Sequence, residues 1–182
     1  MGTKVDPGIE SDGCDGRLEV FEEWGLTMLT VPLEERFNSA FLHFCAAMDG
    51  APGGAVTEPD AETGEQWDNL HVLGHVSEML EYWLAEVLRV LTHGPDEPFG
   101  RLKRSPERIA RIERSSELAV DELRHEIHLR ALATIDLCRL LTPEQLSIRG
   151  LHPKFGLMTV ERILMEFGVE HLHEHALQLE SL

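Results

Sequence analysis

The chain has 182 residues, which is enough for one domain with a full hydrophobic core and too few for two typical domains. Its 33 acidic and 16 basic residues give a formal net charge of −17, which would repel nucleic-acid phosphates and anionic lipid headgroups. We therefore expect neither nucleic acid nor a membrane as a partner, and no apolar run is long enough to cross a bilayer. The cysteines, Cys14, Cys45 and Cys138, are far apart and form no CxxC pair, which favours a reducing cytoplasm over a disulfide framework.

Residues 1–16 are predicted to be a flexible acidic leader, because they are rich in Gly, Asp and Glu and lack the apolar core of a signal peptide. Residues 17–182 are predicted to form a single domain. Its first helix should cover residues 32–48, where Pro32 suits the first turn and apolar residues share one helical face. These face residues are Leu33, Phe37, Ala40, Phe41, Phe44 and Met48. Residues 49–66 show no periodicity and are predicted to be an inserted loop.

Three further helices are predicted from the same periodicity. The second should cover residues 67–91, and the third should start at Ser105-Pro106 and continue to residue 141. The residues on the apolar face of this third helix are Ile109, Ile112, Val120, Leu123, Ile127, Ala131, Thr134 and Cys138. A turn-rich link over residues 149–157 leads into a fourth helix. Four amphipathic helices without an alternating strand pattern predict an all-α fold, a four-helix bundle.

Two histidines near the C-terminus, His171 and His175, are four residues apart and so share one face of the fourth helix. Leu164 and Phe167 lie on the same face, which predicts that both imidazoles point inward. Buried imidazoles need polar partners, and either a hydrogen-bonded core pair or two ligands of one metal ion would provide them. His173 falls on the opposite side and is predicted to face solvent.

A catalytic metal site commonly uses three protein ligands and leaves one position for water or substrate. His75 is the preferred third ligand, because it lies between Val72 and Met79 at the edge of the apolar face of the second helix. His71 lies farther out and is predicted to be a surface residue or to support a ligand. The other histidines considered are expected to be solvated by default: His43, His125, His128 and His152.

Three short motifs follow one another in an order and spacing typical of a known family. They are Trp67-Asp-Asn-Leu-His-Val-Leu-Gly-His75, His152-Pro153-Lys-Phe-Gly156-Leu-Met-Thr159-Val, and Glu170-His171-x-x-x-His175-x-x-Gln178. In these motifs the chain resembles the DinB/YfiT-like metalloproteins over roughly residues 29–182. One difference is that the family often has Asp after the first histidine of the pair, where this chain has Leu172.

The resemblance implies a four-helix bundle with a crossover connection and a homodimer. It matches His75, His171 and His175 to the family's three metal-binding histidines. It also implies the activities of the characterised branches, which include metal-dependent transferases and isomerases that use a low-molecular-weight thiol such as bacillithiol, mycothiol or glutathione. The expected cofactor is a divalent metal, zinc or nickel in the first place, with iron also compatible with imidazole ligands.

A divalent metal bound by three neutral imidazoles would lower the pKa of a bound thiol or water, as a thiol S-transferase requires. Candidates for a catalytic side chain are Glu174, Glu78 and Tyr82, although a solvated helix carboxylate is the ordinary role for either Glu. Two alternatives remain open from the sequence. One is a metal-dependent hydrolase, and the other is a non-enzymatic dimeric bundle with a structural metal or a small-molecule binding role.

Two other metalloenzyme classes are disfavoured. A ferritin-like di-iron centre would use Glu122-x-x-His125 and Glu170-x-x-His173, but these side chains are predicted to project from polar helix faces. A zincin needs the HExxH spacing, which the sequence does not contain.

Overall fold

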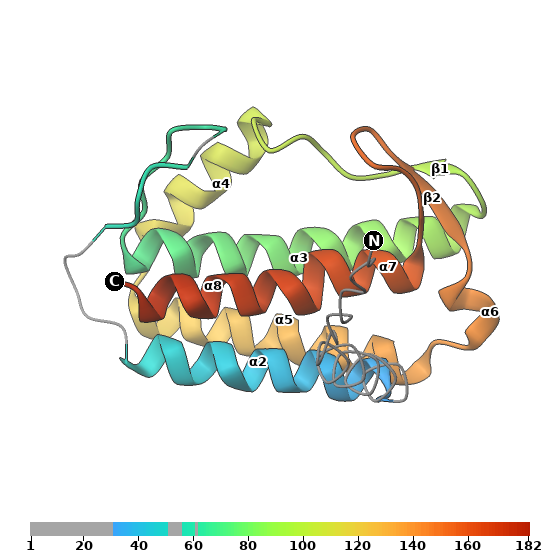
Figure 1. Cartoon of the computed structure of the whole chain (residues 1–182), viewed down its shortest axis with the longest axis horizontal. Helices are drawn as coiled ribbons and strands as arrows, with labels where there is room; N and C mark the ends of the chain where they lie inside the picture. The colour runs from blue at the N-terminus through green and yellow to red at the C-terminus, as the bar shows by residue number, and fades with distance from the viewer. Residues whose placement is uncertain (1–30, 51–55, 61) are drawn as a thin grey trace, which may run out of the picture. The chain divides into compact units, whose positions relative to one another are not determined.

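A computed structural model of the chain describes residues 31–50, 56–60 and 62–182. The residues from Leu33 to Leu182 form one unit, a bundle of long helices (Figure 1). Its long helices are α2 (Leu33–Gly50), α3 (Asn69–His93), α5 (Val120–Leu140) and a last helix made of α7 (Val160–Leu164), η1 (Met165–Glu170) and α8 (His171–Glu180). The predicted leader, residues 1–16, lies outside the described residues.

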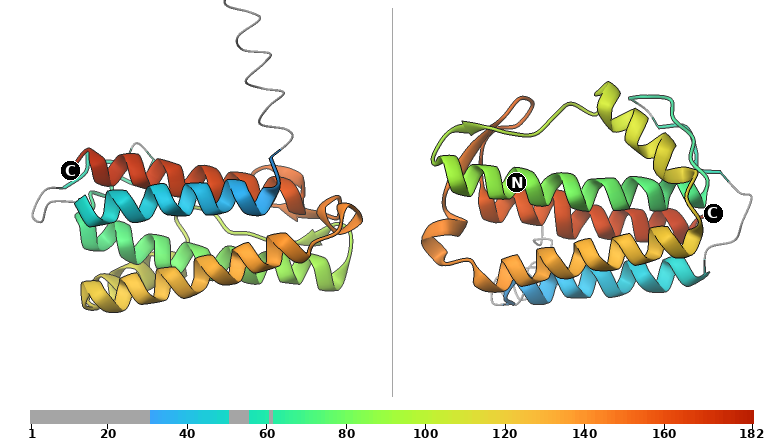
Figure 2. Two further views of the ribbon diagram at one scale, coloured as in Figure 1. Left: turned by 90° about the horizontal axis from the view of Figure 1, so that it is seen from below. Right: turned by 180° about the vertical axis from the view of Figure 1, so that it is seen from behind.

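The four long helices form two layers, with α2 beside α8 and α3 beside α5 (Figure 2). Helices α3 and α5 run in the same direction, so the chain must return to the start of α3 before α5 begins (Figure 1). This crossover connection contains β1 (Glu97–Pro98) and α4 (Pro106–Ser116). The predicted all-α four-helix bundle with a crossover connection is confirmed. Among the described residues, no helix combines the length and apolar character that crossing a membrane requires.

The predicted apolar faces meet in the centre of the bundle. Phe37 and Phe44 of α2, Leu123 and Ile127 of α5, and Leu179 of α8 are completely buried. Burying a side chain of this size contributes about 1.5–3 kcal/mol, so these faces supply much of the stability of the bundle.

The N-terminus of α3 is set by a side-chain cap. Asp68 adopts an extended conformation, and its Oδ1 accepts a hydrogen bond from the backbone N–H of His71 at 3.0 Å. Helix α3 therefore begins two residues later than predicted, and His75 lies in its second turn.

The prediction of one continuous third helix is wrong, because α4 ends before α5 begins at Val120. The backbone N–H of Leu118 bonds the carbonyl of Ser115 at 3.1 Å, and the Glu122 carboxylate accepts from the N–H of Ala119 at 3.2 Å. No Gly or Pro marks the break. Helix α4 packs on the opposite side of α3 from α5, so the break follows from tertiary packing (Figure 1).

Two side chains of the predicted third-helix face also lie elsewhere. Ile109 and Val120 were expected in the core, and each is 38% exposed. Both lie close to where the two real helices begin, so neither is enclosed by neighbouring helices.

A small three-stranded sheet at one end of the bundle is absent from the sequence prediction. Strand β2 (Arg149–His152) pairs in parallel with β1 and antiparallel with β3 (Gly156–Thr159). Strands of two to four residues are too short to show an alternating pattern. Gly150 lets this hairpin approach α3, because a Cβ there would lie 2.5 Å from Phe99 Cδ1 and 2.7 Å from Val90 Cγ2.

The last helix departs from α-geometry in the π-helical segment η1. A π-turn holds one more residue than an α-turn, so the residues that follow it are rotated relative to a continuous α-helix. The buried face accordingly continues in Gly168, Leu172 and Ala176, each one residue later than predicted. Leu172, where the family often has Asp, is completely buried in the core.

Candidate metal centre

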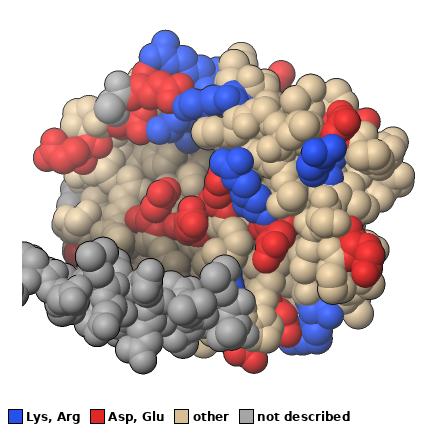
Figure 3. All heavy atoms as spheres, turned by 45° about the vertical axis from the view of Figure 1, so that its right-hand side comes forward, with Lys and Arg blue, Asp and Glu red and all other residues tan. Residues whose placement is uncertain are grey.

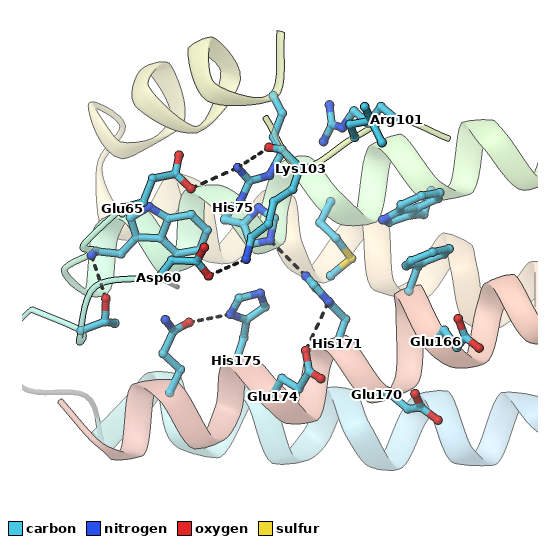
Figure 4. Close-up of a pocket in the computed structure, with 18 of the residues that line it drawn as sticks. Asp60, Glu65, His75, Arg101, Lys103, Glu166, Glu170, His171, Glu174 and His175 are labelled. Carbon is cyan, nitrogen blue, oxygen red and sulfur yellow. Dashed lines mark hydrogen bonds and ion pairs between the residues drawn. The ribbon is translucent and has the colours of Figure 1, made fainter. Parts of the chain in front are cut away.

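Three histidines from two helices come together in the bundle. His75 comes from α3, and His171 and His175 come from α8 (Figure 4). One ring nitrogen from each histidine lies within 4.8 Å of the other two. The structure thus brings together the three residues that were predicted as metal ligands.

Neighbouring side chains orient two of the three imidazoles. Gln178 Oε1 lies 2.7 Å from Nδ1 of His175, so Nδ1 carries the proton and the lone pair is on Nε2. The carboxylate of Glu174 lies 3.5 Å from Nδ1 of His171 and favours the same tautomer there. Both partners are one turn along from the histidine that they orient.

The hydrogen bonding of the cluster is incomplete without a further group. The Nε2 atoms of His75 and His171 lie 3.1 Å apart, and one N–H···N hydrogen bond would satisfy that pair. His75 Nδ1 and His175 Nε2 are buried and have no hydrogen-bond partner within the described chain. A divalent cation accepts lone pairs from several imidazoles at once, so the donor set fits a metal ion.

The electrostatics of the cluster disfavour protonated imidazoles. Burial, and then the neighbouring histidines, lower the pKa values of His75 and His171 well below 6.5. Burial lowers the pKa of His175 to about 4, although its hydrogen bond to Gln178 acts in the opposite direction. All three rings are therefore neutral near pH 7, which is the form that binds a metal ion.

The π-segment determines where the histidine pair points. A continuous α-helix would place His171 and His175 in the middle of the core face. Because Leu172 and Ala176 occupy that face instead, the pair lies at its edge. His171 is half-buried there, and both rings line a cavity.

This cavity has a volume of about 760 Å³ and lies between α3, the last helix and the loops above them. Trp67, Met79 and Trp83 give it an apolar wall. The last helix adds the carboxylates of Glu166, Glu170 and Glu174, and the crossover connection and α4 add Arg101, Lys103 and Arg108. The space-filling view shows the hollow with acidic and basic side chains around it (Figure 3).

The predicted loop over residues 49–66 forms part of this cavity wall. Its described residues include Asp60, which is paired with Lys103, and Glu65, whose carboxylate lies 3.3 Å from Arg108. The bond to Lys103 holds the pKa of Asp60 below its usual range. These ion pairs tie the loop to the crossover connection beside the histidines.

The predicted catalytic candidates occupy three different environments. Glu174 is exposed and lines the cavity beside His171. Glu78 is buried and paired with Arg101 at 2.5 Å, so it is not a solvated helix carboxylate. Tyr82 lies under the Arg101 guanidinium, 3.9 Å from the ring centroid, and burial raises its pKa to about 12. Of the three, only Glu174 touches the cavity.

His43 and His173 are both half-buried, so the predictions that they are solvated are wrong. His173 is half-buried, because its Nδ1 lies 3.0 Å from Nδ1 of His43 on the neighbouring helix α2. His43 in turn bonds Glu180 at 3.1 Å. The helical position of His173 indicated a polar face, but α2 covers that face in the bundle.

His152 is a cavity residue that the sequence analysis missed. It was expected in a solvated loop, but it is 3% exposed and lines the cavity. The HPxFG motif contains it, although nothing in that motif indicates that the hairpin folds back over the cavity. His71 hydrogen-bonds Asp68 at 2.7 Å and lies outside the three-histidine cluster.

Comparison with solved structures identifies the fold. The chain is similar to the mycothiol-dependent maleylpyruvate isomerase, with a TM-score of 0.59 and 21% identity over 82% of this chain and 61% of that one. It is also similar to an uncharacterised protein from Escherichia coli UTI89, with a TM-score of 0.63 and 12% identity over 82% and 89% of the two chains. No protein-family model and no curated protein sequence matches the chain.

A third similar structure is the colibactin self-resistance protein ClbS in complex with a dsDNA, with a TM-score of 0.59 and 10% identity over 82% of this chain and 92% of that one. The absence of a nucleic-acid partner for this chain stays a prediction based on its charge. The chain has the DinB/YfiT-like fold, and it spans 61% of the length of the isomerase.

Proposed function

We propose that this chain is a metal-dependent enzyme in which His75, His171 and His175 bind one divalent ion. The observation that carries the proposal is the buried Nε2 of His175, which has no partner among the described residues and belongs to a cluster of three neutral imidazoles in a cavity wall. A structural metal site is usually closed by four protein ligands, whereas catalytic sites commonly use three. The position beside a cavity therefore favours catalysis.

We further propose that the enzyme transfers or rearranges groups with the help of a small cellular thiol. A divalent metal bound to three imidazoles supplies positive charge that lowers the pKa of a thiol. The chain's own described cysteines are unsuited to this chemistry, because burial raises the pKa of Cys138 to about 12 and also raises that of Cys45. The thiol dependence named for the similar isomerase supports an external thiol.

The protein side chains have separate roles in this proposal. Gln178 and Glu174 hold the imidazoles of His175 and His171 with Nε2 unprotonated. Trp67 packs against His75, with 4.9 Å between ring centroids, and shields the cluster from water. Glu170 lies in the cavity wall beside the cluster and can accept a proton released by the thiol.

Metal content tests the ligand assignment. We expect protein purified without a nickel column to hold about one divalent ion per chain. The double variant His171→Ala, His175→Ala and the single variant His75→Ala should lose it. His173→Ala is the matched control, since it lies between the pair but contacts His43. Retention of stoichiometric metal by the double variant would refute the assignment.

Thiol binding tests the reaction class. Cobalt-substituted protein should be titrated with bacillithiol, mycothiol, glutathione and coenzyme A while its absorption spectrum is recorded. Sulfur ligation should produce an intense charge-transfer band for the correct thiol. If no thiol alters the spectrum and no electrophile such as chloro-dinitrobenzene is conjugated, a metal-dependent hydrolase or a non-enzymatic bundle with a structural metal replaces the transferase proposal.

We also propose a homodimer in a reducing cytoplasm, as the family resemblance and the cysteine pattern suggest. Sedimentation of the purified chain tests the first part. A monomer at micromolar concentration would exclude a stable dimer.

A further inference from the structure

The cavity has two chemically different ends. Two rows of side chains line it at four-residue intervals, one row on each of two antiparallel helices. They are His75, Met79 and Trp83 on α3, and Phe167, His171 and His175 on the last helix. His75 lies beside His171 at one end of the cavity, and Trp83 stacks on Phe167 at the other end. Eight residues of helix span about 12 Å, so the two ends are about that far apart.

Aromatic rings line the other end of the cavity. The rings of Trp83 and Phe167 are stacked, with centroids 3.9 Å apart and planes 4° from parallel. The ring centroid of Phe155 lies 6.0 Å from that of Phe167. Phe155 also lines the cavity, and it is 44% exposed. Flat conjugated groups pack well against such surfaces because offset stacking and edge contacts are both available.

His152 provides a polar group at this end. Its Nδ1 accepts hydrogen bonds from the backbone N–H groups of Lys154 and Phe155, at 3.1 and 3.2 Å, so the proton is on Nε2. The centroid of its ring lies 5.5 Å from the ring centroid of Phe167 and 6.1 Å from that of Trp83. Nε2 has no hydrogen-bond partner within the described chain. Because His152 lines the cavity, an acceptor bound there can take the Nε2 proton.

Lys154 and Glu166, two charged side chains at this end, already have ion-pair partners. Lys154, the basic residue beside Phe155, is already paired with Glu62 at 3.5 Å. Glu166 is paired with Arg162 at 2.5 Å. A neutral acceptor such as a carbonyl oxygen is therefore the better match for His152.

We propose that the aromatic end of the cavity binds a flat, conjugated group of the substrate that carries a neutral hydrogen-bond acceptor. The group lies against Trp83 and Phe167, and its acceptor takes the Nε2 proton of His152. This inference rests on the proposed function in one respect, because it places the reacting group at the histidine end, about 12 Å away. The substrate is then elongated, with its reacting atom and its flat group at opposite ends.

Three small probes test the binding mode on the full chain as purified, with its metal content measured alongside. Coumarin is flat and carries a carbonyl, octahydrocoumarin keeps the carbonyl but is not flat, and naphthalene is flat but has no acceptor. We expect coumarin to bind, with shifts of the Trp83 indole and His152 NMR signals. The other two should bind about three- to tenfold more weakly, because each lacks one of the two interactions.

Two variants of His152 separate ligand binding from a structural role. His152→Asn keeps an acceptor near the position of Nδ1 and lacks the Nε2 donor, whereas His152→Gln keeps a donor near Nε2. We expect the Asn variant to fold normally and lose about three- to tenfold in coumarin affinity but none in naphthalene affinity. The Gln variant should retain coumarin binding in the fraction that folds. Phe167→Leu should weaken both flat probes.

Three results would overturn the inference: no binding of coumarin, equal binding of octahydrocoumarin, or unchanged coumarin affinity in His152→Asn. If His152 has only a structural role, coumarin affinity should be unchanged in His152→Asn, and only His152→Gln should lower the stability of the fold. Metal content should be the same in every variant. Loss of metal binding by the His75 and His171/His175 variants tests the proposed function separately, so the two failures are distinguishable.

Discussion

Gln178 determines which nitrogen of His175 is available, since its Oε1 lies 2.7 Å from Nδ1. Replacing it with Leu leaves the imidazole free to change tautomer and to rotate. We expect Gln178→Leu to lower metal affinity by about 10–100-fold. Competition with a chromophoric chelator measures this. Gln178→Glu keeps an acceptor in place and should retain most of the affinity, so equal loss in both variants would contradict the orienting role.

The lowered histidine pKa values make stability depend on pH. The pKa of His175 is about 4 in the folded chain and 6.5 ordinarily, so between these values the unfolded chain binds a proton that the folded chain does not. Stability therefore rises with pH across this window and is lost as pH falls. We expect the melting midpoint of metal-free protein to drop between pH 6.5 and 4.

The variant His175→Leu isolates this contribution, because it removes the titrating group. Its melting midpoint should depend less steeply on pH over the same window. The exposed His125 offers the matched control, and His125→Leu should retain the wild-type dependence. Parallel curves for wild type and His175→Leu would show that the acid sensitivity has another source.

At the scale of the element, the π-segment Met165–Glu170 acts as a one-residue insertion in the last helix. Deleting Glu166 should restore a continuous α-helix and keep Gly168, Leu172 and Ala176 on the core face. We expect the free energy of unfolding to change by less than about 2 kcal/mol. The deletion moves His171 about 1.5 Å along the helix axis relative to His75, which should weaken metal binding about tenfold or more.

Circular dichroism and chelator competition measure the two effects of this deletion. A deletion within the Glu117–Ala119 connection, where no cavity residue lies, serves as a comparison for general damage to the bundle. Unchanged metal affinity after deletion of Glu166 would show that the segment does not set the position of the histidines.

At the scale of the whole molecule, the core and the candidate metal centre are largely separate. The apolar faces of the four helices meet in one cluster of buried hydrophobic residues, and His75, His171 and His175 lie beside it in the cavity wall. A metal ion should therefore add only its binding free energy to a bundle that is already folded. We expect a chelator to lower the melting midpoint while the helical circular-dichroism signal at 25 °C stays. Loss of that signal on chelation would make the metal a requirement for folding.

Features that depend on neighbouring residues along the chain could be predicted from the sequence. Apolar periodicity located α2, α3, α5 and the last helix, and the four-residue spacing placed His171 and His175 on one face. Apolar periodicity also made His75 the preferred third ligand, and the family resemblance implied the same residue together with the crossover connection. These features were predictable because helix faces and caps are local, and because the motifs keep their order and spacing.

Which helix faces meet depends on packing between distant parts of the chain. The break before α5 has no local signal and follows from α4 packing across α3. The π-segment moved the histidine pair from the core to the cavity edge, and α2 covered His173. The burial of His152 depends on a hairpin of short strands folding over the cavity. Packing between distant segments, which periodicity does not encode, set each of these positions.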